Sequence, residues 1–320
     1  MARKKNTENW FLDSFKIFFR SIKLYFLNFE KFLRLMAFPV LGQIIGLFLI
    51  FAVNYFFIMN VPQLAKTNAL FNNITFVFTL LIIAIIPSFL IFAKAFWDYL
   101  LAMASLTLMA NHILSSGELT EVEIHKDMIK TRIGGYVLLL IVLSMLFTFL
   151  SFPLFWILLI PLAILFSLSI QAFIMEDNLS PFGAMKRSYL FVRYNFFKTL
   201  LVLILLCLLC YVFCPNLFLW AFDKMNLPII FTPPVDLYIN LLPIDELNSY
   251  LASLPINNFE IKSHELSIFI VQNVVAFIVI GFTLPIRAIA CCDLYKDLRG
   301  KNITQDDTEI KKIVKRATSK

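Results

Sequence analysis

EDNLSPFGAMKRSYLFVRYNFFKTL, residues 176–200, is a cationic and aromatic-rich stretch between two long apolar runs. Ser180 followed by Pro181 is typical of the N-cap and first position of a helix. Apolar side chains then recur at the period of one helical face, at Phe182, Met185, Tyr189, Val192 and Phe196. Cations lie off this stripe, at Lys186, Arg187, Arg193 and Lys198. The pattern predicts a helix on an anionic membrane surface; the alternative is a soluble linker helix packed on the rest of the protein.

A similar stretch occurs earlier in the chain. A shift of 167 residues places 15–33 on 182–200. The identical pairs are Phe15/Phe182, Arg20/Arg187, Ser21/Ser188, Asn28/Asn195, Phe29/Phe196, Lys31/Lys198 and Leu33/Leu200. The apolar stripe keeps its phase, at Phe15, Phe18, Ile22, Tyr25 and Phe29. Chance matches in a Phe-rich chain would not preserve the stripe, so we predict two copies of one surface helix.

The composition excludes an ordinary soluble domain. Of the 320 residues, 60 % are hydrophobic and 15 % charged, and the mean hydropathy is +0.82. Helical stretches long enough to cross about 30 Å of hydrocarbon lie near 35–58, 75–97, 134–151, 154–175, 199–221 and 266–290. The helix of the second stretch should continue past Asp98 to about residue 114 as an extension into the cytoplasm. We therefore predict an all-α polytopic membrane bundle of about six transmembrane helices, with amphipathic surface helices.

The distribution of cations predicts the topology. Of 28 Lys and Arg, 25 lie in residues 1–34, 94–133, 176–198 and 287–320, and only Lys66, Lys224 and Lys262 lie elsewhere. By the positive-inside rule both termini are cytoplasmic. The net charge of +7 is then an asymmetry across the membrane, and nucleic-acid binding is not expected.

A second pattern, I-x-A-x-x-x-x-D, closes the even-numbered spans. It occurs at Ile91–Asp98, Ile170–Asp177 and Ile286–Asp293. Three parallel helix-hairpin repeats would fill the chain. The predicted divisions are a polar N-terminus 1–9, repeat 1 at 10–116, repeat 2 at 117–177, repeat 3 at 178–300 and a basic tail 301–320. Repeat 2 begins with a capping box at Thr120–Glu123, and repeat 3 contains a long outer segment, 222–265, where we expect short helices or turns.

Two sets of candidate site residues follow from these patterns. Cations of the surface helices are candidates for binding anionic lipid: Arg20, Lys23, Arg187 and Arg193. We also expect Arg20 and Arg187 to form structural ion pairs with the acids that close the spans, Asp98, Asp177 or Asp293, within a repeat or between neighbouring repeats. Separately solvated charges are the alternative for each pair.

Several motifs resemble a loose bacterial family of six-span proteins. They are Ser180-Pro181, Ala184-Met-Lys186-Arg187-Ser188, Asn195 and the closing Tyr295-Lys-Asp297-Leu298-Arg299. The family includes the YciC-like proteins and the membrane domain joined to some glycerophosphodiester phosphodiesterases, and its members are largely uncharacterised. The resemblance implies a helical bundle in the bacterial inner membrane. The short tail after Asp293 leaves no room for the fused catalytic domain, so phosphodiesterase activity is not expected here.

The sequence contains few groups that could perform chemistry. There is no Walker loop, HExxH or G-x-S-x-G motif, and no paired intramembrane carboxylates. The five cysteines and three histidines fit no disulfide or metal pattern, so we expect neither cofactor nor metal. Cys207, Cys210 and Cys214 should lie on one face of the fifth span as small core residues.

Two functions remain possible. One is a non-catalytic scaffold that binds anionic membrane lipid or a partner protein. The other is a transporter or lipid-translocating protein with a pathway between the repeats. Ion-coupled transport usually needs intramembrane charge, and its scarcity favours the scaffold.

Overall fold

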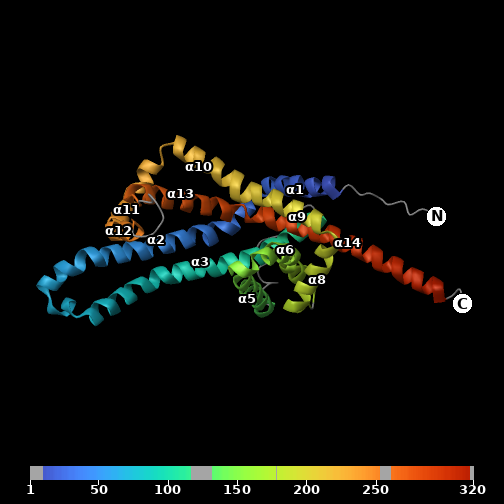
Figure 1. Cartoon of the computed structure of the whole chain (residues 1–320), viewed down its shortest axis with the longest axis horizontal. Coiled ribbons are helices and arrows are strands. Elements are labelled where there is room, and N and C mark those ends of the chain that lie inside the picture. The colour runs from blue at the N-terminus through green and yellow to red at the C-terminus, as the bar shows by residue number, and fades with distance from the viewer. Residues whose placement is uncertain (1–9, 117–131, 178, 253–260, 318–320) are drawn as a thin grey trace. The chain divides into compact units, whose positions relative to one another are not determined.

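The computed structural model describes residues 10–116, 132–177, 179–252 and 261–317, and these form helices throughout their regular structure (Figure 1). Six segments are long and apolar enough to cross a membrane: Phe29–Thr67, Ile74–Ser115, Ile133–Leu150, Pro153–Met175, Phe196–Lys224 and Ser263–Gly300. The predicted all-α fold with six spans is confirmed, and the chain is a multi-pass membrane protein. The N-terminus 1–9 and the capping box at Thr120–Glu123 lie outside the described residues.

The chain forms two compact units, each assembled from separated segments. Unit 1 comprises Met1–Leu35, Leu100–Leu209 and Thr283–Lys320, and unit 2 comprises Met36–Tyr99 and Cys210–Phe282. These units do not follow the boundaries of the three predicted repeats, which stay a prediction.

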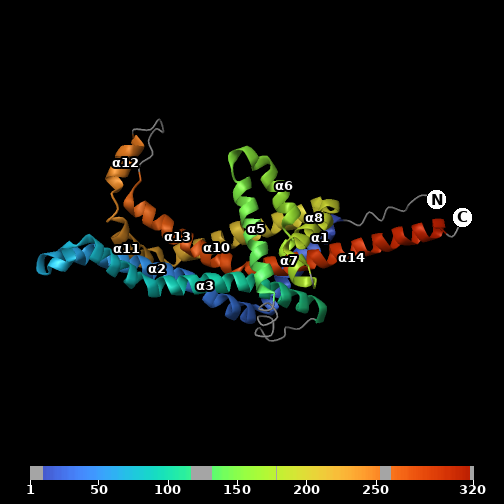
Figure 2. The same cartoon turned by 90° about the horizontal axis from the view of Figure 1, so that it is seen from below.

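Unit 1 contains several short helices, one end of each of two long helices and the whole of a third long helix. Its short helices are α1 (Trp10–Leu27), α5 (Ile133–Leu150), α6 (Trp156–Phe166), α7 (Ser169–Met175), α8 (Pro181–Tyr194) and α9 (Phe196–Cys207). The start of α2 (Phe29–Thr67) and the end of α3 (Ile74–Ser116) also belong to it, together with all of α14 (Leu284–Ala317). Helices α5 and α6 form an antiparallel hairpin (Figure 2). Its turn passes through Ser151 and a 3-10 helix η2 that begins at Pro153 (Pro153–Phe155), between the predicted spans 134–151 and 154–175.

The core of unit 1 lies where the end of α3 meets the first half of α14. Helix α3 continues without a break past Asp98, as expected, but its last turns are not a solvated extension. Their buried side chains include Leu106, Met109 and Ile113. On α14, Tyr295 and Leu298 are fully buried. The segment that begins with Tyr295 is therefore central to the packing of unit 1.

The face that each predicted surface helix buries overlaps the apolar stripe only at Tyr25 on α1 and Val192 on α8. The buried residues are Ser14, Ile17, Ser21 and Tyr25 on α1, and Ala184, Ser188, Phe191 and Val192 on α8. Most of these directly precede a stripe residue. Small side chains on this face, such as Ser21 and Ser188, let neighbouring helices approach closely, and larger ones such as Ile17 and Phe191 fill the space between them. Much of the stripe and the side chains beside it stay partly or fully exposed.

The two stretches also break at corresponding positions. Helix α1 ends before Asn28, and the side-chain amide of Asn28 donates a hydrogen bond to the carbonyl of Leu24 at 3.0 Å. Helix α8 ends before Asn195, whose amide donates to the carbonyl of Phe191 at 3.2 Å. The identical asparagines thus compete with the helix for a backbone carbonyl in the same way. A new helix, α2 or α9, starts at the next residue.

Unit 2 contains the remaining parts of α2 and α3 with α10 (Cys214–Lys224), α11 (Pro228–Ile239), α12 (Ile244–Ala252) and α13 (Ser263–Phe282). Helices α11 and α12 confirm the short helices expected within 222–265. Helices α2 and α3 approach closely at Gly42 and Gly46. A Cβ atom at Gly42 would lie 2.8 Å from the Cβ of Ala95, and one at Gly46 would lie 2.7 Å from the backbone nitrogen of Phe92. The Gly-x-x-x-Gly spacing therefore serves packing inside the chain.

The cysteines of the fifth span do not share one buried face. The π-helix η3 (Leu208–Phe213) separates α9 from α10, and Pro215 follows it. A proline ring clashes with the carbonyl four residues earlier, and a wider π turn relieves that contact. The extra residue changes the helical phase, so Cys210 is buried, Cys214 is half-buried and Cys207 is exposed. The expectation that all three are core residues was wrong for Cys207.

Candidate functional site

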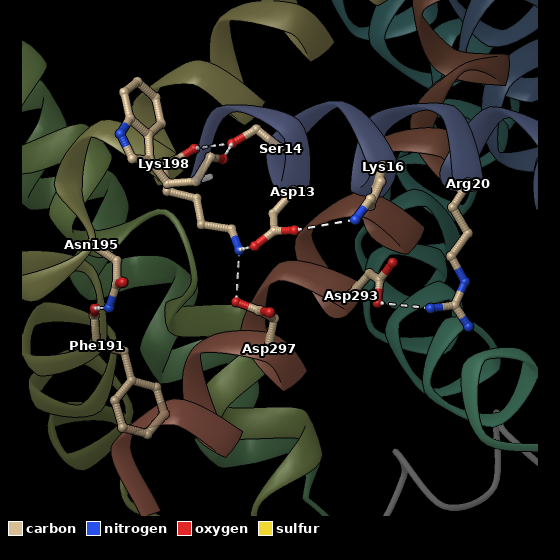
Figure 3. Close-up of polar contacts among 10 residues, drawn as sticks. Asp13, Ser14, Lys16, Arg20, Phe191, Asn195, Lys198, Asp293 and Asp297 are labelled. Carbon is tan, nitrogen blue, oxygen red and sulfur yellow. Dashed lines mark hydrogen bonds and ion pairs between the residues drawn. The ribbon is translucent and has the colours of Figure 1, made fainter. Parts of the chain in front are cut away.

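A buried lysine forms the first polar cluster of unit 1. Lys198, near the start of α9, has a side chain only 3 % exposed. Its Nζ lies 2.8 Å from Asp297 Oδ2 on α14 and 3.8 Å from Asp13 Oδ2 on α1 (Figure 3). The Oδ1 atom of Asp13 also lies 3.7 Å from Nζ of the exposed Lys16. This Lys198 cluster joins three helices through groups that water cannot freely solvate.

One of the predicted ion pairs lies beside this cluster. Arg20 on α1 places Nη1 3.4 Å from Oδ1 of Asp293 on α14 (Figure 3). The arginine is 53 % exposed and the aspartate 13 %. In the predicted division of the chain, Arg20 belongs to repeat 1 and Asp293 is the aspartate that ends the second span of repeat 3.

A second cluster surrounds Glu176, which directly follows α7 and is 8 % exposed. Its Oε1 accepts a hydrogen bond from the buried Tyr295 hydroxyl at 2.7 Å, and its Oε2 accepts one from Arg187 Nε at 3.1 Å. Nε of Arg299 lies 3.7 Å from Oε1. The carbonyl of Glu176 also accepts from Arg132 Nη1 at 3.2 Å. We call these five residues the Glu176 cluster.

A third contact involves the end of α3. Lys296 Nζ donates to the carbonyl of Asn111 at 2.8 Å and to Ser115 Oγ at 2.6 Å. Lys296 therefore ties α14 to the last turns of α3.

The residues predicted to form structural ion pairs have different partners in the structure. Arg187 pairs with Glu176 and not with the neighbouring Asp177, which is 98 % exposed and lies 3.9 Å from Arg132. Asp98 lies 2.5 Å from Lys94, one turn earlier on α3.

Two of the predicted lipid-binding cations stay exposed and form no ion pair with a described residue. They are Lys23 on α1 and Arg193 on α8. The guanidinium of Arg193 lies 5.9 Å from the ring centres of both Tyr189 and Tyr194. Arg20 and Arg187 each have a carboxylate partner, so the four candidates divide into two paired and two unpaired cations.

Sequence reasoning missed the most buried charges. It placed Lys198 among the cations beside a lipid-facing stripe, whereas the structure buries it. Lys198 is identical to Lys31 in the alignment of the two stretches, yet Lys31 is exposed. Asp297 and Tyr295 belong to a motif that was noticed only for its resemblance to a family. The acids that approach Lys198 come from distant helices, which no local pattern could reveal.

This arrangement is suited to holding helices together and to presenting cations. Buried charges are matched by opposite charges, and among the described residues no group of three His, Cys, Asp or Glu side chains could hold a metal ion. No family model, no curated protein and no solved structure matches the chain.

Proposed function

We propose that this protein is a non-catalytic membrane scaffold whose unit 1 binds the headgroup layer of anionic lipid. One observation carries the proposal. The buried charges are paired within the protein, whereas cations on the outer faces of α1 and α8 form no ion pair with a described residue. The bacterial inner membrane, with both termini cytoplasmic, is the proposed location, in line with the positive-inside rule.

The outer faces have the composition of an interfacial helix. On α1 the exposed Phe19 and Phe26 lie beside Lys23. On α8 the exposed Phe182 lies one turn from Lys186, and the exposed Tyr194 lies beside Arg193. Aromatic and long apolar side chains enter the boundary between headgroups and acyl chains, while lysine and arginine contact the lipid phosphates. The opposite faces of both helices pack within unit 1, so this surface can hold a protein core at the headgroup layer.

The transport alternative has less support. A coupled transporter needs ionisable groups along its pathway, and in the described part of unit 1 the buried ionisable groups are paired with opposite charges. Glu176, Lys198 and Asp297 each have an opposite charge within 3.1 Å. Ion pairs of this kind hold helices together, and because each charge already has a partner they are poorly suited to binding and releasing a transported ion.

The lipid proposal predicts a charge-dependent preference. The purified protein should bind vesicles containing phosphatidylglycerol more tightly than vesicles of phosphatidylcholine alone. Each exposed cation near an anionic surface contributes about 1 kcal/mol. Lys23→Gln with Arg193→Gln should therefore weaken binding to anionic vesicles about tenfold or more, as measured by co-flotation.

The matched control is Lys16→Gln with Arg34→Gln. It removes the same charge from exposed cations that already contact Asp13 and Glu30, and it should change binding less. If both double variants lose the same binding affinity for anionic vesicles, the effect depends only on net charge, and this result would contradict the assigned surface. Equal binding of the wild type to both lipids would overturn the proposed function.

The topology predicts which positions react from outside the cell. Single cysteines at Asn72 and Ser249 should be labelled by an impermeant maleimide in intact cells, and cysteines at Ser116 and Thr304 only after lysis. Ser249 is preferred to Asn248, because the Asn248 amide makes hydrogen bonds of 2.8 and 2.9 Å with the backbone of Ile261. The five native cysteines must first be replaced by serine or alanine. Labelling of Ser116→Cys in intact cells would mean that the segment after Asp98 crosses the membrane.

A further inference from the structure

We propose that Arg132, Arg187 and Arg299 form a discrete binding site for the phosphate group of one anionic lipid, with Glu176 as the residue that positions them. This inference rests on the proposed function and deepens it, because it assigns a single site apart from the general cationic surface at Lys23 and Arg193. The cluster is built from three segments, since Arg132 precedes α5, Arg187 lies on α8 and Arg299 lies on α14.

The Glu176 cluster has more cations than acids among the residues that the structure describes. Three guanidinium groups approach Glu176, and within that part of the chain one other acid is near, the exposed Asp177 at 3.9 Å from Arg132. One buried carboxylate cannot neutralise three cations. The described residues of the cluster therefore carry an excess positive charge beside a partly buried surface, where screening by water is weakened.

Arg187 and Arg299 keep N–H donors that the cluster does not use. Arg187 and Arg299 both approach Glu176 through Nε, so their Nη1 and Nη2 groups make no hydrogen bond with a described residue. These side chains are 45 % and 46 % exposed, which leaves the outer edge of each guanidinium accessible. Nη2 of Arg132 is buried and has no hydrogen-bond partner.

The aromatic rings restrict how two of these arginines can turn. The guanidinium carbon of Arg132 lies 4.6 Å from the ring centre of Phe173, and that of Arg187 lies 5.4 Å from the ring centre of Phe191. Such contacts favour a cation over an aromatic face. A planar guanidinium with two free N–H groups on one edge binds two phosphate oxygens at once.

The surroundings favour a lipid over a soluble phosphate. Leu190 and Tyr194 follow Arg187 by three and seven residues, which places them on the same face of α8, and both are exposed. A phosphate carried by a lipid would bring acyl chains to these apolar side chains. Inorganic phosphate would gain nothing from them, so we assign the site to a phospholipid.

Native mass spectrometry of the full chain in detergent tests the site. Titration with phosphatidylglycerol should give one tight adduct per chain, bound at least about tenfold more tightly than phosphatidylcholine, whose choline group the arginines repel. Arg187→Gln with Arg299→Gln should weaken this adduct about tenfold or more. Arg187→Lys with Arg299→Lys keeps both charges but loses the planar fork, and it should show a smaller loss.

The control is Lys23→Gln with Arg193→Gln, which removes two cations outside the cluster and should leave the one-to-one adduct unchanged. Thermal melting of each variant checks that it is folded. If the double glutamine variant does not fold, the double lysine variant still tests whether the planar guanidinium groups contribute to binding of the lipid. Undiminished phosphatidylglycerol binding by a folded glutamine variant would overturn the site. Inorganic phosphate or glycerol 3-phosphate competing at the lipid's own affinity would overturn the assignment to a lipid.

The two proposals fail in different ways. If the protein prefers anionic vesicles but the affinity of the lipid adduct does not depend on Arg187 and Arg299, the site is overturned and the proposed function stands. A one-to-one adduct that depends on these arginines, without any vesicle preference, supports the site and overturns the general headgroup surface.

Discussion

Replacing Lys198 with methionine is expected to destabilise unit 1 strongly. Methionine has a similar length and fills the same space as the buried lysine, but it leaves Asp297 and Asp13, whose side chains are only 31 % and 29 % exposed, without their shared cation. Removing one partner of a buried pair typically costs roughly 3–5 kcal/mol. The expected result is a clear fall in the melting temperature of the protein in detergent.

Two further variants separate the ion pair from other effects. Lys31→Met removes the corresponding lysine of the first stretch, which is exposed, and should cost less than about 1 kcal/mol. Lys198→Met with Asp297→Asn removes both partners of the shorter contact and should recover part of the lost stability. A melting temperature of Lys198→Met equal to that of the wild type would show that the pair contributes nothing to stability.

Gly46→Ala is expected to have the next largest effect. Its Cβ would lie 2.7 Å from the backbone nitrogen and 2.8 Å from the Cα of Phe92, so α2 and α3 must move apart. Overpacking of this kind typically costs about 1–3 kcal/mol. Because the obstacle is backbone, shortening the side chain with Phe92→Ala should not restore the melting temperature.

The neighbouring glycine provides a contrasting case. At Gly42 the added Cβ would meet the Cβ of Ala95 at 2.8 Å, so Gly42→Ala should be rescued by Ala95→Gly. Gly134→Ala, where no atom lies within 4 Å of the new Cβ, is the control and should not lower the melting temperature. Equal melting temperatures for Gly46→Ala and Gly134→Ala would contradict the close approach of α2 and α3.

The sequence by itself determined the class of the protein and much of its local structure. Apolar length predicts the six spans, because a helix must cover the hydrocarbon thickness with apolar side chains. Local chemistry predicts the start of α8, where Ser180 Oγ accepts from Gly183 N at 3.0 Å and Pro181 follows the cap. The tight turn before Pro153 also follows from local constraints. These features depend on neighbouring residues, so a pattern can reveal them.

Tertiary structure alone decided which faces and which charges are buried. The apolar stripe gave the helical period of α1 and α8, but the small side chains beside it, such as Ser21 and Ser188, determined the packed face. Lys31 and Lys198 occupy the same place in their stretches, yet Lys31 is exposed, whereas Lys198 is buried against acids from α14 and α1. The partner of Arg187 likewise depends on the fold that brings α7, α8 and α14 together. The physical reason is that burial and ion pairing depend on contacts between segments far apart in the chain, and no local period encodes those contacts.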